Sequence, residues 1–595
     1  MKKDISKYSF AFAVIFFLFA CSKNYLDKAA IGSTSQTTLA TYSGASSLLT
    51  GAYALLHGNG AEGGGWPSGK WIFGGVASDD AHTGTEAGAL QPVPSFENYT
   101  VDPTNSSVNS KWNFLYAAVQ RANDVLRILP LIPAGGITAD QATQLKAEAV
   151  FLRAYYHLEA AMMWKNIPYI DETISFENGN FYVPNTEPVW SKIEQDFKFA
   201  ADSLTATKAD AGRVNSWAAK AFLVKTYMFQ HKYNEAKPLL DDIIANGVTA
   251  NGKKYALLEK YHDNWLPSQK NNAESVFAVQ MSVNDGAGGD NGTTAYGGGY
   301  MGPYGGPFPT YGFYQPSFSL VNSYKTDPAT GLPLINNFND FDVTNDEGIP
   351  SSSPFTPYSG TLDPRLDWTV GRRGIPYLDW GVMPGLSWIR QQSVAGPYLH
   401  IKSANVKAEP SASQGYSTAV NYLLIRFADV LLWAAEVEVE LGNLAKAESY
   451  VNIVRARAAN PEGWVYNYLD NNDPSKGYSA TPAANYKIGL YNGQFEALGQ
   501  DFARESVRFE RKLELAMEDH RFFDLQRYDN GTGYMAKVLN DYIQHETSIP
   551  GYNFTYMNGA KFTKNKNEIY PIPQAQIDLS VKDGKSALTQ NPGYQ

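Results

Sequence analysis

A run of acidic residues and one histidine near the C-terminal end of the chain has the residue types that acid–base or metal chemistry needs. They lie in the charged stretch Arg504 to Tyr528 and are Glu510, Glu514, Glu518, Asp519 and His520. A glycoside hydrolase needs two carboxylates that flank one bond, one of them with a raised pKa. The arginines of this stretch would instead lower the pKa of nearby carboxylates. The spacing also matches no zinc motif such as H-E-x-x-H. We therefore interpret these side chains as a structural ion-pair network.

The rest of the sequence holds few other groups suited to catalysis. Cys21 is the only cysteine, and the chain has neither a G-x-S-x-G motif nor a G-x-x-x-x-G-K-[ST] phosphate loop. One oxygen-rich cluster has the ligand types that Ca²⁺ prefers. Its members are Asp340, Asp342, Asn345, Asp346 and Glu347. We expect a solvated turn there, with a Ca²⁺ site as the alternative, and we expect no other metal and no cofactor.

Two loop regions combine aromatic rings with polar groups, as sugar binding requires. Flat rings pack against the C–H faces of a sugar while polar groups bind its hydroxyls, and such sites are mostly preformed. The first region, 58–103, contributes Trp66, Trp71, Asp79, Asp80, His82 and Glu86. The second has ten glycines in the 22 residues from Asp285 to Gly306, and it contributes Tyr296, Tyr300, Tyr304, Tyr311 and Tyr314. Packing of the loops is the alternative for each ring. Trp368, Trp380 and Trp388 are expected to pack inside the region that contains them.

Two helix pairs of similar design must hold these loops. They are predicted over Ala218 to Ile244 and over Asn421 to Ala459, the second with a turn at Gly442-Asn443. At a constant offset of 211 positions, Tyr233, Ala236, Leu240 and Ile243 fall on Leu444, Ala447, Val451 and Val454. A small alanine where two helices cross is typical of tetratricopeptide-type repeats, because bulk there would separate the helices. The pattern predicts a mainly α-helical, paired-helix scaffold.

Further helices are predicted from apolar periodicity. They cover Thr38 to His57, Trp112 to Leu129, Asp140 to Trp164 and Pro188 to Leu204. Arg504 to Tyr528 is predicted as one helix with internal ion pairs such as Arg511 with Glu514. Residues 250–415 lack helical periodicity and are rich in Gly and Pro, which predicts a long, irregular, loop-rich insertion with a few short strands.

Charge and the N-terminal segment restrict the class of function. The net charge of −10 gives no basic surplus for binding nucleic acid. Three lysines precede an apolar run at 8–20 that is too short to span a bilayer and is typical of a signal peptide. The run ends in Leu18-Phe19-Ala20-Cys21, which resembles the lipobox of bacterial lipoproteins. We expect a covalent lipid at Cys21 to anchor the mature protein, with a buried thiol as the alternative. No later stretch is long and apolar enough for a membrane-spanning helix.

These observations divide the chain into segments. We predict a signal peptide at 1–20, a lipidated Cys21 with a flexible tether at 21–36, and the first part of the scaffold at 37–249, which includes the ligand-side loop 58–103. The insertion at 250–415, the second part of the scaffold at 416–545 and a tail at 546–595 follow. Because the two matched pairs belong to one repeat design, we expect 37–595 to form one compact domain.

Seven segments, taken in order, resemble the SusD/RagB family of lipid-anchored nutrient-binding proteins. They are the lipobox with NYLDKAAIGSTSQTTL, WNFLYAAVQRANDVL, KAEAVFLRAYYHLEAAMMWKNIPYI, LDPRLDWTVGRRGIPYLDWG, IRFADVLLWAAEVEVELGN, ERKLELAMEDHRFFDLQRY and the YPIP ending. The resemblance covers nearly the whole chain. It departs at Ser22-Lys23-Asn24, where many surface-displayed members carry acidic residues.

The resemblance implies a SusD-like fold in which loops on paired helices carry the binding site, within the same two regions. It also implies a lipid-anchored protein on the outer face of the outer membrane. Such a protein binds a glycan and delivers it to a SusC-like TonB-dependent transporter without catalysis, and its charged helix is a structural element. Three alternatives stay open: a binder of peptides or another nutrient, a lipid-anchored glycoside hydrolase, and a scaffold that binds only protein.

Overall fold

The computed structural model describes residues 36–57, 69–89, 91–176, 178–283, 301–307, 310–408, 418–550 and 556–595. Four predicted site residues lie outside this part of the chain: Cys21, Trp66, Tyr296 and Tyr300. The segment predicted as a signal peptide also lies outside it. Within these ranges, no helix has both the length and the apolar character needed to cross a membrane.

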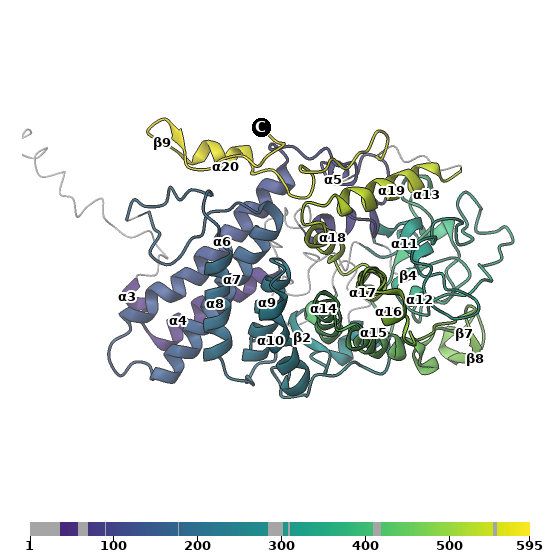
Figure 1. Ribbon diagram of the computed structural model, residues 1–595, viewed down its shortest axis with the longest axis horizontal. Coiled ribbons are helices and arrows are strands. Elements are labelled where there is room, and N and C mark those ends of the chain that lie inside the picture. The colour runs from purple at the N-terminus through teal and green to yellow at the C-terminus, as the bar shows by residue number, and fades with distance from the viewer. Residues whose placement is uncertain are drawn as a thin grey trace, which may run out of the picture.

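The first part of the scaffold is a row of helices in which neighbours along the chain pack on one another (Figure 1). They are α3 (Gln36–Leu39), α4 (Tyr42–Ala54), α6 (Ser106–Ile128), α7 (Ala139–Trp164), α8 (Trp190–Ser203), α9 (Ser216–Met228) and α10 (Tyr233–Asn246). Every residue from Ala147 to Trp164 of α7 is buried, which accounts for its apolar character on all sides. Thr138 begins this helix through a capping box with Gln141.

The two matched helix pairs form as predicted and lie side by side. The second pair consists of α14 (Phe427–Glu440) and α15 (Leu444–Ala459), and α10 of the first pair packs against α14. The matched alanines, Ala236 and Ala447, are fully buried. Gly442 in the turn has a φ of 82°, a backbone conformation that glycine adopts without strain. The fold is therefore a mainly α-helical, tetratricopeptide-like array.

The start of the second pair is a strand, which corrects the prediction of helix from Asn421. Strand β6 (Tyr422–Arg426) pairs antiparallel with β2 (Ser275–Val279). A short apolar run such as the one in β6 is compatible with either structure, and a partner strand from far along the chain decides the outcome. The N–H of Phe427 donates to the carbonyl of Glu274 at 2.8 Å, so helix α14 begins where the strand pairing ends.

The charged stretch is two helices, not the single helix that its sequence predicts. Helix α17 (Gln500–Leu515) and helix α18 (Arg521–Asp529) are separated by a turn in which Met517 and Asp519 have φ values of 62° and 65°. The N–H of Met517 donates to the carboxylate of Asp80 at 3.1 Å, a contact that holds the chain out of helical geometry. The predicted ion pair within one helix is also wrong, because Arg511 bonds Asp429 and Asp524 instead of Glu514.

The insertion consists of short elements, as predicted. They are η5 (Tyr261–Trp265), η6 (Pro267–Gln269), β2, β3 (Phe313–Pro316), α11 (Phe318–Ser323), α12 (Leu366–Thr369), β4 (Val370–Gly371), η8 (Leu386–Trp388), α13 (Gln392–Ala395) and β5 (Leu399–His400). Where the chain is described, each strand pairs antiparallel with one other strand, in the order β1–β3, β2–β6, β4–β5, β7–β8 and β9–β10.

The remaining elements are short turns and the helices of the C-terminal part. They are η1 (Leu55–His57), η3 (Trp71–Val76), β1 (Ala81–Gly84), α5 (Pro94–Glu97), η4 (Leu129–Leu131), η10 (Pro461–Gly463), β7 (Tyr466–Tyr468), η11 (Pro474–Lys476), β8 (Tyr478–Pro482), α16 (Gln494–Leu498), α19 (Tyr534–Ser548), α20 (Gln574–Leu579), β9 (Val581–Lys582) and β10 (Lys585–Ser586). Helix α20 and the chain end lie beside α6 in Figure 1. The tail also contacts α7, because the indole N–H of Trp164 donates to the carbonyl of Pro571 at 2.9 Å.

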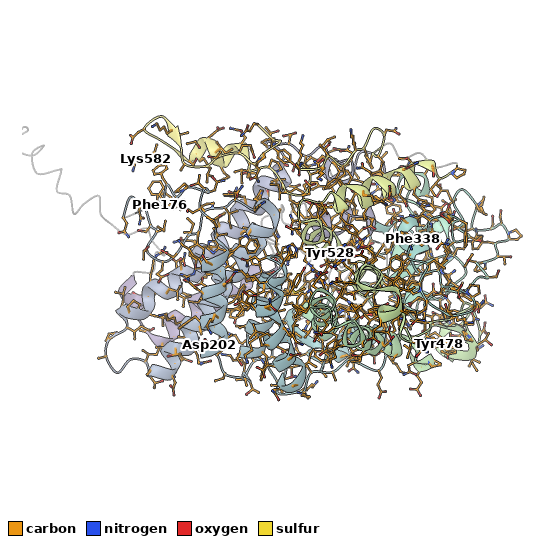
Figure 2. All side chains as sticks on the ribbon, viewed as in Figure 1. Phe176, Asp202, Phe338, Tyr478, Tyr528 and Lys582 are labelled. Carbon is orange, nitrogen blue, oxygen red and sulfur yellow. The ribbon has the colours of Figure 1, made fainter. Side chains whose placement is uncertain are left out.

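Side chains fill the interior throughout (Figure 2), and one continuous apolar core joins α4, both helix pairs and the tail. A smaller core lies within the insertion and consists of Tyr377, Leu378, Met383, Ile389, Leu399, Ile401 and Ala404. Trp368, Trp380 and Trp388 are half-buried against it, so these three rings pack inside the insertion as predicted.

Candidate functional site

The acidic side chains of α17 lie in a buried ion-pair network centred on Arg426, which is almost completely buried. Its Nη1 lies 2.8 Å from Glu274 Oε1 and 2.5 Å from Glu514 Oε1, and its Nε lies 2.9 Å from Glu518 Oε2. Arg426 is the last residue of β6, so the strand pairing itself brings this guanidinium to α17. An unpaired charge at this depth would be costly, and each acid here has a cationic partner.

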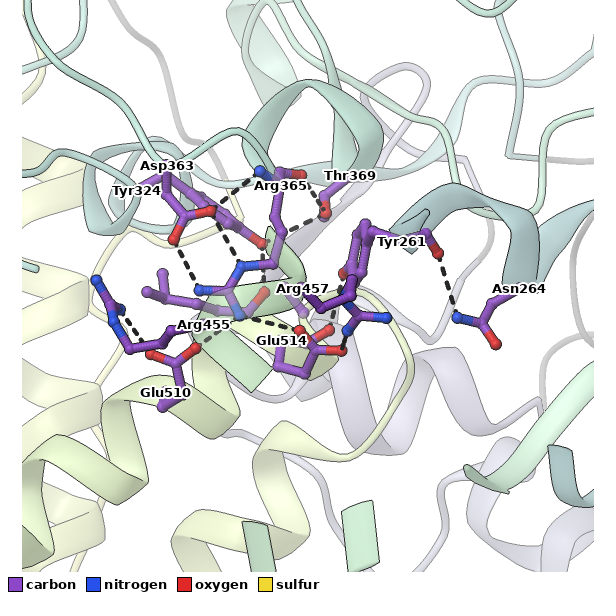
Figure 3. Close-up of polar contacts among 12 residues, drawn as sticks. Tyr261, Asn264, Tyr324, Asp363, Arg365, Thr369, Arg455, Arg457, Glu510 and Glu514 are labelled. Atoms are coloured by element: carbon purple, nitrogen blue, oxygen red, sulfur yellow. Dashed lines mark hydrogen bonds and ion pairs between the residues drawn. The ribbon is translucent and has the colours of Figure 1, made fainter. Parts of the chain in front are cut away.

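Further arginines surround Glu510 and Glu514 in the C-terminal part of α17 (Figure 3). Glu514 also pairs with Arg457 and with Arg365, the latter at 2.9 Å, and Glu510 pairs with Arg365 and Arg455 at 2.7 and 2.8 Å. Burial alone would raise the pKa of Glu514, but the guanidinium groups outweigh burial and hold that pKa well below its usual range. The prediction of a structural ion-pair network is confirmed for Glu510, Glu514 and Glu518. It is wrong for His520, whose pKa burial lowers to about 3.

Asp519 differs from its neighbours because burial raises its pKa to about 6. The hydroxyls of Tyr314 and Tyr422 both donate to this carboxylate at 2.8 Å. The adjoining cavity, lined also by His400 and Lys402, has a volume of about 50 Å³. That is room for water and not for a sugar ring.

Three polar residues predicted from the first loop region, Asp79, Asp80 and His82, are buried and bind distant parts of the chain. Asp79 bridges Lys512 and Arg521 at 2.9 and 2.7 Å. His82 lies between Glu97 and Glu546, with N–O distances of 2.7 and 3.0 Å. These contacts join β1 to α17, α18 and α19, so they hold the loop region onto the scaffold.

The pKa values in this cluster reflect burial and neighbouring charge. Burial, assisted by the charge of Asp79, raises the pKa of Asp80 to about 7. Burial alone would lower the pKa of His82, but its hydrogen bonds to Glu546 and Glu97 outweigh burial and raise that pKa to about 9. Both groups are buried, so their pKa values are set by contacts with other residues of the chain.

Trp71 and Tyr314 are interior rings as well. They are 2% and 1% exposed, and their centroids are 5.7 Å apart. The placement corrects the prediction for five residues, because a side chain at this depth does not reach a ligand unless the core opens. The five are Trp71, Asp79, Asp80, His82 and Tyr314. Short polar and aromatic loop segments give no sign of partners that lie hundreds of positions away.

Among the predicted ligand contacts that the structure describes, Tyr304 and Tyr311 reach the surface, with 43% and 37% of each residue exposed. The guanidinium of Arg390 lies 4.7 Å from the ring centroid of Tyr304 and forms an ion pair with Glu86. Its Nη1 also donates to Thr85 Oγ1 at 3.3 Å. We call Glu86, Tyr304, Tyr311 and Arg390 the tyrosine platform. It joins the two predicted loop regions on one surface.

Strand pairing brings the two regions together. In the antiparallel pair β1–β3, His82 lies opposite Gln315, so the segment containing Glu86 follows one strand and the segment containing Tyr311 precedes the other. The N–H of Tyr304 donates to the carbonyl of Trp388 at 2.9 Å, which places the loop beside Arg390. Arg390 could not be predicted as a site residue, because no motif or periodicity distinguishes it from other arginines.

The oxygen-rich cluster proposed for Ca²⁺ is divided among protein partners. Asp342 lies 3.0 Å from His545 and accepts a hydrogen bond from Asn322 at 2.7 Å, while Asp346 accepts one from Gln392 at 3.2 Å. Within the described ranges, no three residues of the types His, Cys, Asp and Glu gather in a way that could hold a metal ion.

Comparison with protein families identifies two matching models. The model described as "SusD family" matches residues 273–594, and the model described as "Starch-binding associating with outer membrane" matches residues 77–228. Among curated relatives, SusD-like protein P25 of Formosa agariphila is 24% identical over 500 residues, which are 82% of this chain and 80% of that protein. SusD-like protein P2 of the same organism is 22% identical over 504 residues, which are 84% of this chain and 83% of that protein.

Solved structures share the fold over nearly the whole chain. A SusD superfamily protein from Bacteroides vulgatus has a TM-score of 0.65 at 20% identity, covering 93% of this chain and 99% of that one. A laminarin-binding SusD-like protein has a TM-score of 0.61 at 23% identity, covering 92% and 99%. Surface glycan-binding protein A from Bacteroides thetaiotaomicron, in complex with laminarihexaose, has a TM-score of 0.59 at 18% identity, covering 92% and 98%. At these identities the likeness shows the fold. Because the first family model spans more than half of the sequence, the chain belongs to the SusD family.

Proposed function

We propose that this protein binds an oligosaccharide or polysaccharide at the tyrosine platform. The observation that carries the proposal is the partly exposed ring of Tyr304 beside Arg390 and Glu86. Tyr311, also partly exposed, is near it, because a Cβ added at the adjacent Gly312 would lie 3.7 Å from Tyr304 Cβ. A tyrosine ring offers a flat apolar face to the C–H groups of a sugar, and the charged pair offers donors and acceptors for its hydroxyls. The laminarin-binding and laminarihexaose-bound proteins of similar fold support this ligand class.

The platform is partly ordered before any ligand arrives. Arg390 is held by its ion pair with Glu86 and its hydrogen bond to Thr85, and it covers one side of the Tyr304 ring. Preorganised groups lose less conformational freedom on binding, so more of the contact energy remains as affinity. The ordered platform should therefore bind a sugar more tightly than the same side chains would if they were flexible.

We further propose that Cys21 carries a covalent lipid and anchors the protein to the outer face of the outer membrane. Family membership supports a second protein as partner, a SusC-like TonB-dependent transporter that receives the glycan. In this proposal the protein performs no catalysis, a view supported by the arginine-paired acids of α17. A peptide or another nutrient as ligand is the alternative within the same family.

The test is binding of the purified chain to a panel of polysaccharides and oligosaccharides, including laminarin and starch. Tyr304→Ala and Tyr311→Ala are each expected to weaken binding severalfold to tenfold, because a ring contact contributes about 0.5–1.5 kcal/mol beyond its buried area. Tyr42→Ala, which removes a 41% exposed tyrosine on α4, is the matched control and should leave affinity unchanged.

Three results would contradict the proposal. Binding to peptides in the absence of any glycan binding would replace the ligand class. Unchanged affinity in the Tyr304 and Tyr311 variants would remove the platform as the site. Release of reducing sugar during the assay, abolished by substitution of a single carboxylate, would establish a hydrolase.

A further inference from the structure

A second site is a cleft that lies apart from the tyrosine platform and is lined by different residues. It is a cleft of about 580 Å³ between η5, the insertion core and the β7–β8 hairpin, which is at the lower right of Figure 1, where Figure 2 labels Tyr478. Its aromatic lining residues are Trp368, Trp464, Tyr466 and Tyr478. We call it the aromatic cleft. Its volume falls in the range of small-molecule sites, and it shares no lining residue with the platform.

Hydrogen bonds to backbone carbonyls fix the rings of the aromatic cleft. The indole N–H of Trp368 donates to Gly463 at 2.6 Å, and that of Trp464 donates to Ala458 at 3.1 Å. The hydroxyl of Tyr478 donates to the carbonyl of Leu378 at 2.8 Å. The polar atom of each ring is therefore already satisfied by the protein, and what remains for a ligand is hydrocarbon surface in a fixed orientation.

Two of these rings are also supported from behind by a second ring. His262 stacks on Trp368 with centroids 4.3 Å apart and an interplanar angle of 14°. Tyr468 stacks on Tyr478 at 5.1 Å and 21°. Tyr478 is 47% exposed and lines the cleft, so the face that Tyr468 does not cover is available for a flat ligand.

His262 supports a neighbouring ring and does not reach a ligand. The residue is 7% exposed, and both of its ring nitrogens are buried without a hydrogen-bond partner among the described residues. Burial lowers its pKa to about 3, so the ring is neutral at neutral pH. It offers the cleft no accessible polar atom and contributes through its stack on Trp368.

Charged groups line the cleft, and they differ in whether other residues of the protein already bind them. Asp379 is occupied, because its oxygens accept the N–H groups of Lys407 and Ala408 at 2.7 and 2.9 Å. The half-buried carboxylate of Asp263 makes no hydrogen bond or ion pair to any residue that the structure describes. Burial raises its pKa, with the charge of Lys260 opposing. Asp263 is therefore an open acceptor beside the aromatic faces.

We propose that the aromatic cleft is a second saccharide-binding site, in which sugar rings stack on Trp464 and Tyr478 while Asp263 binds hydroxyls. Fixed ring faces beside an unused acceptor match the two surfaces of a sugar, one of C–H groups and one of hydroxyls. A purely apolar ligand would leave Asp263 without a partner. One long polysaccharide held at both sites would bind more tightly than its fragments do at either site.

The test is calorimetric titration of the full-length chain with five hexasaccharides: β-1,3-, α-1,4- and β-1,4-glucans, a β-1,4-mannan and a β-1,4-xylan. In a Tyr304→Ala/Tyr311→Ala background, which weakens the platform, at least one hexasaccharide should still bind. Adding Trp464→Ala should then reduce affinity at least tenfold. Trp464→Phe, which keeps an aromatic face, should stay within about threefold of the parent, since the ring contact rather than the indole N–H is used.

Two further variants separate binding from folding. Leu469→Ala is the control. Leu469 follows β7, and its 65% exposed side chain lies outside the cleft, so its removal should leave affinity and melting temperature unchanged. Asp263→Ala removes the unused carboxylate at the edge of the cleft, and should weaken binding several-fold with an unchanged melting temperature.

The outcomes distinguish the two sites. If Trp464→Ala and Asp263→Ala leave every affinity unchanged while the platform variants abolish binding, the cleft proposal is overturned and the platform stands. If only the cleft variants weaken binding, the cleft stands and the platform falls. If none of the five hexasaccharides binds the unaltered chain, both are overturned.

Discussion

Single buried side chains account for much of how the loop regions are held on the scaffold. His82 contacts carboxylates from α5 and α19, and His545 lies beside the same Glu546 at 3.2 Å. Glu546 also accepts the N–H of Ser319 at 2.7 Å, so one carboxylate connects three segments. These histidines are positioned to be charged inside the protein, and their protonation is therefore linked to stability.

Stability should fall as pH rises from neutral to alkaline. The folded-state pKa of His82 is raised to about 9, above its ordinary value of about 6.5, so its stabilising contribution is complete below 6.5 and lost as pH rises through 9. His545, also raised to about 9, acts in the same direction. Melting temperatures measured from pH 6 to pH 9.5 should show this decline.

Substitution of His82 tests directly whether this histidine causes the decline in stability. His82→Gln should lower the melting temperature at pH 6 and reduce its change between pH 6 and 9.5, because the variant carries no proton to lose. An unaltered pH dependence in this variant would assign the decline to other groups.

At the scale of elements, the ion-pair network fixes how α17 meets β6 and the insertion. Arg426 comes from β6, Arg365 precedes α12 and Arg457 comes from α15, and all three reach Glu514. Four segments thus converge on one carboxylate near the end of a helix. An arrangement with every charge paired also explains how a helix so rich in Arg and Glu is buried.

Arg426→Met should destabilise the protein by about 3–5 kcal/mol, because it leaves Glu274, Glu514 and Glu518 with an excess of buried negative charge. Lys537→Met is the control, since it removes an exposed pair with Asp541 that contributes about 1 kcal/mol or less. Chemical denaturation of both variants measures the difference. Equal midpoints would show that the network contributes no more than a surface pair.

At the scale of the whole molecule, segments from opposite ends of the chain pack closely. Gly74 of η3 lies against the backbone of Asp519, between α17 and α18, and a Cβ added there would be 2.0 Å from the Asp519 carbonyl oxygen. Tyr570 in the tail donates its hydroxyl to the carbonyl of Phe73 at 3.0 Å. The loop region, the charged helices and the tail therefore meet in one place.

Gly74→Ala should lower the melting temperature, because either backbone must move to accept the methyl group. Gly51→Ala is the matched control: Gly51 is inside α4 with nothing within 4 Å of an added Cβ, so alanine should stabilise the helix by about 0.5–1 kcal/mol. Thermal unfolding of the two variants should shift in opposite directions. A neutral Gly74→Ala would contradict the close packing.

The sequence alone determined the helical design of this protein. Periodicity located α6, α7 and the two matched pairs, since the spacing of apolar residues along the sequence shows which side of a helix faces the core. It also directed attention to the loop regions that supply Tyr304, Tyr311 and Glu86. Seven ordered segments were sufficient to indicate the family that the comparisons then confirmed.

Only the tertiary structure decided which residues of those regions are exposed. Asp79 and Lys512 are 433 positions apart, and no local pattern in either segment predicts that they meet. The same holds for Arg390 on the platform and for the aromatic cleft, whose walls come from several separate segments between Lys260 and Ala480. Local spacing records the conformation of a segment and the side that it buries. The choice of partner depends on the path of the whole chain, which brings distant segments together only when the core assembles.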